Sequence, residues 1–217
     1  TIDTWFGRLA AADERIDVAY ELYRRTRRWQ ADTFRAGFKT MVWLEQARDD
    51  DVRGVVAALL ETPYRPWFGE AYAWALTELG DLDAAADLVG GALPPLDDSW
   101  MFLGVLGAAA HVRVALGDRE SATVIRDHLR PYVGRLACVG TGVALGDVAL
   151  AVARVEHLLG DDAEARRLAD TSVDLLSRSG PGPWLVRSLL FRADLTGDEG
   201  DRGRAAQIVD DLGLELL

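Results

Sequence analysis

Residues 79–85 of the sequence read LGDLDAA, and the pattern returns at residues 116–122 (LGDRESA), at 159–165 (LGDDAEA) and, with weaker agreement, at 199–205 (EGDRGRA). Each copy is typical of a helix end, a turn and the start of a second helix. A glycine after an apolar segment can adopt the left-handed backbone conformation that closes a helix, and the aspartate after it accepts hydrogen bonds from the free N–H groups of the next helix. We therefore predict four helix-turn-helix units.

Small residues flank each of these turns at fixed distances. The fifth residue after each glycine is an alanine, and so is the seventh residue before it; these positions are Ala73, Ala85, Ala110, Ala122, Ala153, Ala165, Ala193 and Ala205. An alanine on each of two facing helices allows their backbones to approach closely. The pattern predicts that the two helices of each unit contact each other at these alanines.

The four glycines are 37, 43 and 40 residues apart, which matches a helix-turn-helix unit plus a connection of variable length. Repetition at this period is the signature of an α-solenoid, in which each unit packs mainly on its neighbours. The turn and both alanine positions resemble the tetratricopeptide repeat, although its aromatic positions are mostly lost and its usual period is about 34 residues. The expected fold class is all-α: a solenoid of tetratricopeptide-like antiparallel helix pairs over residues 1–217, less regular over 1–64 and regular over 65–217.

Apolar periodicity locates the individual helices. We expect them at about residues 13–28, 31–47, 52–60, 67–79, 82–92, 99–116, 119–130, 144–159, 162–178, 183–195 and 202–215. Residues 1–12 are expected to form the end of a helix, and the three consecutive acids Asp49, Asp50 and Asp51 suit a helix N-terminus better than a metal site. No segment shows the alternation typical of a β-strand.

The least regular segment, residues 131–147, contains Gly140, Gly142 and Gly146. No lysine follows a glycine, and the spacing is one residue too wide for a dinucleotide-binding Gly-x-Gly-x-x-Gly motif, which also requires a preceding strand. We interpret the segment as a tight apolar loop that folds over the helices rather than as a nucleotide site. A ligand cavity beneath residues 136–147 is left open.

The chain has 217 residues, a net charge of −11 and a pI of about 4.7. A nucleic-acid-binding protein needs a basic surface, so we expect no direct nucleic-acid partner. Neither a signal peptide nor a run of about 18 apolar residues occurs, so no membrane partner is expected.

The single Cys138 has no partner for an internal disulfide, which favours a reducing cytoplasm and a buried apolar thiol. Because the sequence starts at Thr1 rather than methionine, we expect a fragment of a longer protein.

Candidate catalytic and metal-binding residues are sparse. His111, His128 and His157 are spread along the chain rather than paired at the four-residue spacing of a zinc-binding helix. No Gly-x-Ser-x-Gly nucleophile motif occurs, and the paired acids fall at expected helix ends. The sequence therefore predicts no enzyme activity, no metal and no cofactor.

A solenoid of helix pairs offers a concave groove lined by the first helix of each pair. In the tetratricopeptide register, the groove-facing residues are expected to include Glu70, Trp74, His111, Asp147, Arg154, His157 and Arg187. A groove with charges of both signs and one tryptophan suits a peptide segment or a small amphipathic ligand. The alternative is that these side chains face water or a neighbouring domain and bind nothing specific.

Several stretches closely resemble the C-terminal helical region of large actinobacterial regulators: residues 129–135 (LRPYVGR), 145–148 (LGDV), 158–165 (LLGDDAEA) and 182–185 (GPWL). Those proteins join an ATP-binding module of the signal-transduction NTPase type to a long tetratricopeptide-like arm. They also carry a LuxR-type or winged helix-turn-helix domain, or an adenylate cyclase domain. The resemblance covers residues 65–217 well and 1–64 weakly. It implies that this chain is the arm, because the family's ATP-binding and DNA-binding motifs match nothing in it; ATP would be bound only by a module outside the chain.

The leading functional hypothesis is a non-catalytic arm of such a transcriptional regulator, which binds a protein or peptide partner, or other domains of the same regulator, and senses a signal. One alternative is a stand-alone small-molecule-binding protein or enzyme on the same solenoid, which would show a closed apolar cavity with converging polar groups. Another is a scaffold that forms homodimers through an exposed apolar helix.

Overall fold

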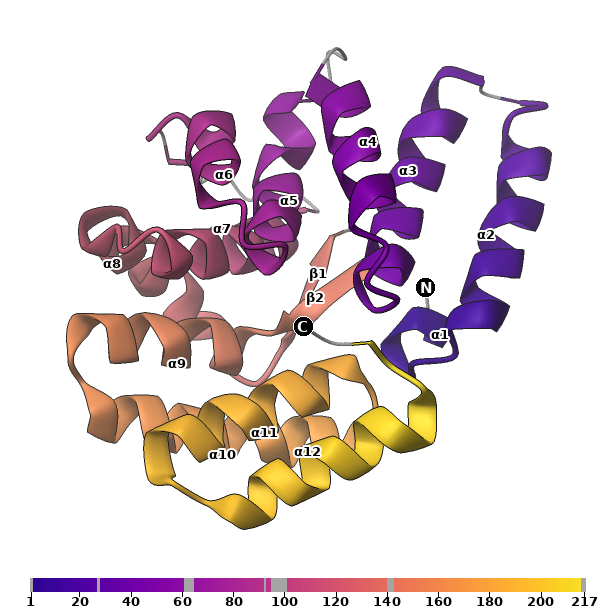
Figure 1. Cartoon of the computed structure of the whole chain (residues 1–217). Coiled ribbons are helices and arrows are strands. Elements are labelled where there is room, and N and C mark those ends of the chain that lie inside the picture. Colours follow the sequence, from indigo (N-terminus) through magenta and orange to yellow (C-terminus); the bar gives the residue numbers. More distant parts are fainter. Residues whose placement is uncertain are drawn as a thin grey trace.

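Helices account for most of the chain in the computed structural model, which describes residues 2–26, 28–60, 65–91, 93–94, 101–139 and 143–215 (Figure 1). For residues 28–30, 59–60 and 65–67 the description is limited to the backbone. The elements are α1 (Ile2–Trp5), α2 (Leu9–Tyr23), α3 (Arg28–Leu44), α4 (Asp49–Leu60), α5 (Arg65–Glu78), α6 (Leu82–Val89), α7 (Phe102–Ala115), α8 (Arg119–Leu129), the 3-10 helix η1 (Arg130–Tyr132), β1 (Leu136–Val139), β2 (Val143–Asp147), α9 (Val148–Leu159), α10 (Asp162–Ser179), α11 (Pro183–Thr196) and α12 (Glu199–Leu212). The predominantly helical character predicted from the sequence is confirmed. Within the described ranges, no helix is both long and apolar enough to cross a bilayer.

Glycine-aspartate turns join the helices of the pairs α5–α6, α7–α8 and α9–α10, as predicted. Gly80, Gly117 and Gly160 adopt φ values of 72°, 69° and 92°. The carboxylates of Asp81, Asp118 and Asp161 accept hydrogen bonds from the backbone N–H groups of Ala84, Ser121 and Glu164 at 3.3, 3.1 and 3.0 Å. Each turn therefore closes one helix through a left-handed glycine and opens the next through an aspartate cap.

The fourth turn lies three residues before the predicted position. Gly197, with a φ of 74°, ends α11, and Asp198 accepts a hydrogen bond from the N–H of Gly200 at 2.8 Å. Gly200, which the sequence pattern placed in the turn, lies inside α12. The prediction was wrong here because the glycine nearest to the end of α11 closes it, and Thr196 stands where the other copies have leucine.

The alanine pattern predicted the helix contacts correctly. All eight alanines are at most 1% exposed; they are Ala73, Ala85, Ala110, Ala122, Ala153, Ala165, Ala193 and Ala205. The helices of the pairs α5–α6, α7–α8, α9–α10 and α11–α12 pack on each other. The alanines of α11 and α12 remain buried although their turn has shifted, so side-chain packing, rather than the position of the turn, aligns this pair.

The N-terminal helices follow the same plan with different residues. Ala47 takes the place of glycine between α3 and α4: it adopts a φ of 47°, and the carbonyl of Trp43 accepts a hydrogen bond from the N–H of Arg48 at 3.0 Å. Asp49–Asp51 form the first turn of α4, as predicted. Residues 1–12 were expected to form the end of one helix, and this prediction was wrong. Gly7, with a φ of 67°, separates the short α1 from α2.

A two-stranded antiparallel hairpin, which the sequence analysis did not predict, occupies residues 136–147. Leu136 pairs with Asp147, and Val139 pairs with Val143. In Figure 1 the hairpin lies in the middle of the molecule, with the helices around it, and it packs on α7, α9 and α11. Residues 140–142, which include the predicted loop glycines Gly140 and Gly142, lie outside the described residues. The expectation of a tight loop folded over the helices was wrong, because residues 136–139 and 143–147 form paired strands among the helices, and α9 begins at Val148 rather than at residue 144.

Two glycines of α7 seat the hairpin. A Cβ atom at Gly104 would lie 2.6 Å from the backbone nitrogen of Val139, and one at Gly107 would lie 2.8 Å from the Cβ of Ala137. Cβ atoms in close-packed proteins do not approach non-bonded atoms this closely. The backbone of β1 therefore rests directly on the backbone of α7, which requires glycine at both positions.

The first and last elements of the chain meet. A Cβ atom at Gly7 would lie 2.8 Å from Cδ1 of Leu212 in α12, and one at Gly182 would lie 2.1 Å from the carbonyl oxygen of Trp5. After α12, the N–H of Glu215 donates a hydrogen bond to the carbonyl of Glu45 at 3.0 Å. The helices therefore curve around the hairpin until α12 reaches α1 (Figure 1).

Candidate binding groove

A cavity of about 410 Å³ opens between the first helices of four successive pairs, with lining residues on α5, α7, α9 and α11. Leu44, the last residue of α3, closes one side. Of the residues predicted to face a groove, His111, Arg154 and Arg187 line this cavity. We call it the α5–α11 groove.

Arg154 is the partly buried cation of this groove. Its Nη1 lies 3.3 Å from Nδ1 of His111, and its guanidinium lies 5.8 Å from the ring centroid of Phe191. It forms no ion pair with a carboxylate among the residues that the structure describes. Burial lowers the pKa of Arg154; the charge of Glu78 opposes this shift, the charge of Arg187 adds to it, and the charge of Asp194 opposes it. An arginine nevertheless remains charged in proteins, so its N–H groups are donors that lack a charged acceptor.

His111 is neutral and its tautomer follows from its neighbour. Burial, and then the charges of Arg154 and Arg187, lower the pKa of His111 well below its ordinary value. A guanidinium can only donate, so Nδ1 of His111 must accept and its proton is on Nε2. This Nε2 is buried and has no hydrogen-bond partner in the described part of the chain.

Arg187 is a structural residue, although it also lines the groove. Its Nη1 donates to Glu45 at 2.9 Å, and its Nη2 and Nε donate to Glu78 at 3.0 and 3.2 Å. Burial opposes the charge of Arg187, but Glu45 and Glu78 outweigh it and raise its pKa. The three residues connect α11 with α5 and with the turn after α3, and the charge of Arg187 is satisfied within the protein.

Stacked rings lie behind the groove. The rings of Trp74 and Trp184 stack with centroids 5.5 Å apart, and the ring of His111 stacks on Trp184 at 5.9 Å. Trp74 was expected to face the groove, but it is 1% exposed and supports the wall of the groove from behind. This column holds His111, and through it Arg154, in a fixed position.

The other predicted residues lie elsewhere. Glu70 accepts a hydrogen bond from Arg113 at 2.9 Å, and the exposed His157 has its Nδ1 2.7 Å from Asp162. Asp147 is fully buried: it caps α9 at the N–H of Leu150, at 3.1 Å, and accepts a hydrogen bond from Ser172 at 2.6 Å. Burial raises the pKa of Asp147, while these hydrogen bonds oppose the shift. It connects the end of β2 to α9 and α10.

Sequence reasoning overlooked the apolar and acidic side chains of the same groove. Leu190, Phe191 and Asp194 lie three, four and seven residues after Arg187 on α11, and all line the cavity. This spacing places residues on one face of a helix, so it was a usable signal once Arg187 was chosen. Phe191 and Leu190 provide an apolar wall beside Arg154.

The described residues contain no group of three or more histidine, cysteine, aspartate or glutamate side chains arranged to hold a metal ion. Cys138 is partly buried, and burial raises the pKa of its thiol, so at neutral pH it carries its proton. The α5–α11 groove presents the guanidinium of Arg154, which has no ion-pair partner among the described residues, the imidazole of His111, the carboxylates of Glu78 and Asp194, and an apolar wall.

Comparison of the chain with protein-family models, with curated proteins and with solved structures gave no match.

Proposed function

We propose that this chain is a non-catalytic binding module that holds a segment of a protein or peptide in the α5–α11 groove. The observation that carries the proposal is the guanidinium of Arg154, which is partly buried without a carboxylate partner in the described residues. A charge withdrawn from water without an ion-pair partner destabilises a protein. A carboxylate of a bound segment supplies that partner, and Phe191 and Leu190 accommodate an apolar side chain next to it.

The helix pairs support a tetratricopeptide-like architecture for this module. The glycine-aspartate turns and the buried alanines recur in consecutive pairs, and the first helix of each pair lines the groove. The contact between the two ends distinguishes it from an open array. In this proposal the repeats form a solenoid that curves back until α12 meets α1.

The resemblance to the helical arm of actinobacterial transcriptional regulators suggests a setting for the module. We place it in the cytoplasm as an interaction and sensing arm, with a protein partner or other domains of a regulator as its ligand. A net charge of −11 disfavours direct contact with nucleic acid. ATP and DNA would be bound by other modules.

A screen of short random peptides, with free and with amidated C-termini, tests the groove. We expect the bound peptides to share an aspartate, a glutamate or a free C-terminal carboxylate next to an apolar side chain. Arg154→Gln should weaken their binding about tenfold or more, because a hydrogen bond to a charged group contributes about 1.5–3 kcal/mol. The control Arg178→Gln removes an exposed arginine of α10 and should leave binding unchanged.

Two results would contradict the proposal. One is a set of selected peptides without a common carboxylate; the other is equal binding of the selected peptides to Arg154→Gln and to the unaltered protein. Isothermal titration calorimetry with the purified chain distinguishes these results from a change in folded fraction, because it reports stoichiometry together with affinity.

A further inference from the structure

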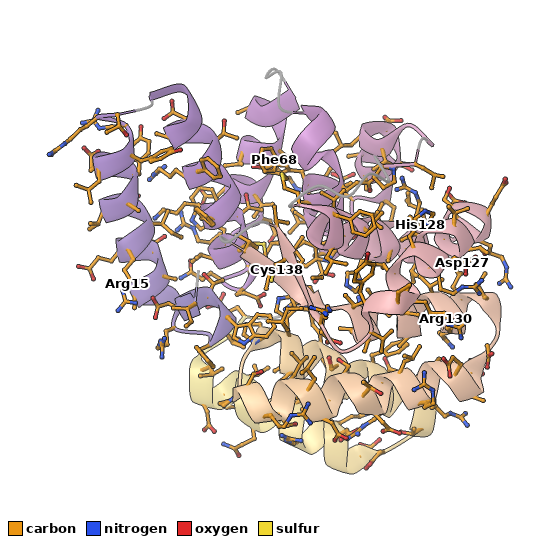
Figure 2. All side chains as sticks on the ribbon, turned by 180° about the vertical axis from the view of Figure 1, so that it is seen from behind. Arg15, Phe68, Asp127, His128, Arg130 and Cys138 are labelled. Atoms are coloured by element: carbon orange, nitrogen blue, oxygen red, sulfur yellow. The ribbon has the colours of Figure 1, made fainter. Side chains whose placement is uncertain are left out.

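A second cavity, of about 370 Å³, lies between α2, α3, α5 and the hairpin. Its wall is apolar and rich in aromatic rings, including Phe34, Phe38 and Phe68 with Val139 and Val143 of the hairpin. Figure 2, seen from behind, labels Phe68 on α5, which lines the pocket, and Cys138 on β1, next to the lining residue Val139. We call it the hairpin pocket. It shares no lining residue with the α5–α11 groove.

The hairpin pocket carries almost no charge. Arg35 is the charged residue of its described lining, and its guanidinium is paired with Asp17 at 2.9 Å and lies over the ring of Tyr20. The hydroxyls of Tyr20 and Thr40 are also used, since they donate to Asp32 and to the carbonyl of Ala36 at 2.8 and 2.9 Å. Neither an anion nor a cation would find a free counter-charge here.

Tyr72 differs from Tyr20 and Thr40, whose hydroxyls are hydrogen-bonded. The residue is 3% exposed, and its hydroxyl has no hydrogen-bond partner in the described residues. The hydroxyl lies over Gly37 of α3, 3.7 Å from the position that a Cβ atom would occupy. Burial raises the pKa of Tyr72, so the hydroxyl keeps its proton and remains a donor. A buried hydroxyl without a partner destabilises a folded protein, and buried polar groups in native proteins are nearly always hydrogen-bonded.

We infer that the hairpin pocket binds an uncharged small molecule, mainly hydrocarbon or aromatic, with one oxygen that accepts a hydrogen bond from Tyr72. The volume falls within the range of small-molecule sites, which are apolar with a few placed polar groups. The apolar wall excludes charged ligands, because no residue compensates for their desolvation. The Tyr72 hydroxyl selects molecules that have an oxygen over pure hydrocarbons.

This inference goes beyond the peptide groove and assigns a second, independent site to the chain. A bound molecule would contact Val139 and Val143, and the hairpin that carries them also packs on α7, α9 and α11. Three of the helices that line the groove thus contact the same hairpin. A ligand in the pocket would therefore contact a hairpin that packs on three of the helices lining the groove.

The test uses the neutral fluorescent dye N-phenyl-1-naphthylamine, which brightens in apolar sites, and competition by two compounds of equal chain length, 1-decanol and decanoate. The purified chain should bind the dye saturably at one site. 1-Decanol should displace it at least tenfold more effectively than decanoate, which carries a charge. Dye binding that does not saturate, or equal displacement of the dye by 1-decanol and decanoate, would overturn the inference.

Three variants locate the site. Ala71→Phe fills the pocket from α5 and should weaken dye binding at least tenfold; Ala71→Leu replaces it if the larger residue prevents folding. Tyr72→Phe should leave dye binding unchanged but weaken 1-decanol about fivefold. Tyr132→Phe removes a hydroxyl outside the pocket and should change neither. Unchanged dye binding in the filled variant, or identical results for Tyr72→Phe and Tyr132→Phe, contradicts the assignment.

The two proposals fail separately. Arg154→Gln should leave dye binding intact, and Tyr72→Phe should leave peptide binding intact. Circular dichroism and melting temperature of every variant confirm that each comparison is made between folded proteins.

Discussion

Ala47 occupies a backbone conformation that the other described helix ends of this type give to glycine. Its φ of 47° lies in the left-handed region, where a Cβ atom approaches the following carbonyl oxygen. Gly80, Gly117 and Gly160 adopt the same region without this cost. The turn between α3 and α4 is therefore strained at one residue, and the sequence gives no sign of it, because alanine is a common helix residue.

Ala47→Gly should raise the free energy of unfolding by about 1 kcal/mol, since relief of the left-handed strain exceeds the added chain entropy of glycine. Ala47 is exposed, so no packing is lost. The matched reverse change, Gly117→Ala, should lower stability by about the same amount, because no other atom lies within 4 Å of the added Cβ. Urea unfolding measures both, and equal effects of the two changes in the same direction would contradict the assignment of strain.

At the residue scale, the sequence predicted the interactions between groups that are close in the chain and missed those between distant groups. The aspartate caps and buried alanines were predicted because the groups that interact are close in sequence. Asp147 and Trp74 were placed in the groove by extending one helical register. The hairpin before α9 turns Asp147 into a buried cap, and Trp184 covers Trp74.

At the scale of elements, the contact between the hairpin and α7 decides the interior of the molecule. Gly104 lies inside α7 and touches the backbone of β1. Glycine inside a helix is unfavourable by itself, by about 0.5–1 kcal/mol relative to alanine, so it is present for the contact.

Gly104→Ala should lower the free energy of unfolding by about 1–3 kcal/mol, because the new Cβ atom forces β1 away from α7. Gly203→Ala is the control: Gly203 is exposed in α12 with nothing within 4 Å, so the same change should raise stability by about 0.5–1 kcal/mol. Chemical denaturation gives both values. A stabilised Gly104→Ala variant would show that the hairpin is not seated on α7.

The hairpin was missed for a physical reason. Each strand is only four or five residues long, too short for alternation to be distinguished from a loop. Its position depends on glycines of α7 that are remote in sequence. The three regular turns, in contrast, were predicted from seven residues each, and the fourth was misplaced because two glycines compete within four residues.

Ion pairs between helix pairs add a pH dependence to the fold. The carboxylate of Glu164 in α10 accepts hydrogen bonds from Arg167 and from Arg130, which follows α8. Figure 2 shows Arg130 on the same side of the molecule as Asp127 and His128. The bonds to Arg167, and then to Arg130, lower the pKa of Glu164 to about 2 from an ordinary value of 4.5. Because the folded value lies below the unfolded one, this contribution is complete above the unfolded pKa and is lost as pH falls towards the folded one.

Glu164→Gln should therefore lower the free energy of unfolding by about 1 kcal/mol near neutral pH, the upper range for a solvent-screened pair. The difference from the unaltered protein should disappear towards pH 2. Glu120→Gln, an exposed glutamate in the first turn of α8, is the control and should not reproduce this pH profile. A difference that persists at pH 2 would assign the effect to packing.

At the scale of the whole molecule, Arg187 joins parts of the chain that are far apart in sequence. It pairs with Glu45, which is 2% exposed, and with Glu78. Burial raises the pKa of Glu45, and Arg187 opposes that rise. The sequence contained all three residues, but nothing in it indicated that they meet, because their contact depends on how the helix pairs curve.

Arg187→Leu should lower the free energy of unfolding by about 3–5 kcal/mol, since it leaves Glu45 buried without its cation. The double variant Glu45→Leu with Arg187→Leu should recover part of this loss, because no isolated charge remains. Arg178→Leu, an exposed arginine, should change stability by less than about 0.5 kcal/mol. A double variant less stable than Arg187→Leu would contradict this account of the ion pair.

The contact of α1 with α11 and α12 has a consequence for how the protein melts. In a linear array, the outermost unit has one neighbour and can fray first. Here the tail of α12 rests on Gly7, and the start of α11 rests on Trp5, so neither terminus is a weak point. Calorimetry should accordingly record one sharp endotherm whose van't Hoff and calorimetric enthalpies agree. Gly182→Val would displace the start of α11 from Trp5. The terminal helices would then lose this contact, and thermal unfolding would proceed in more than one step.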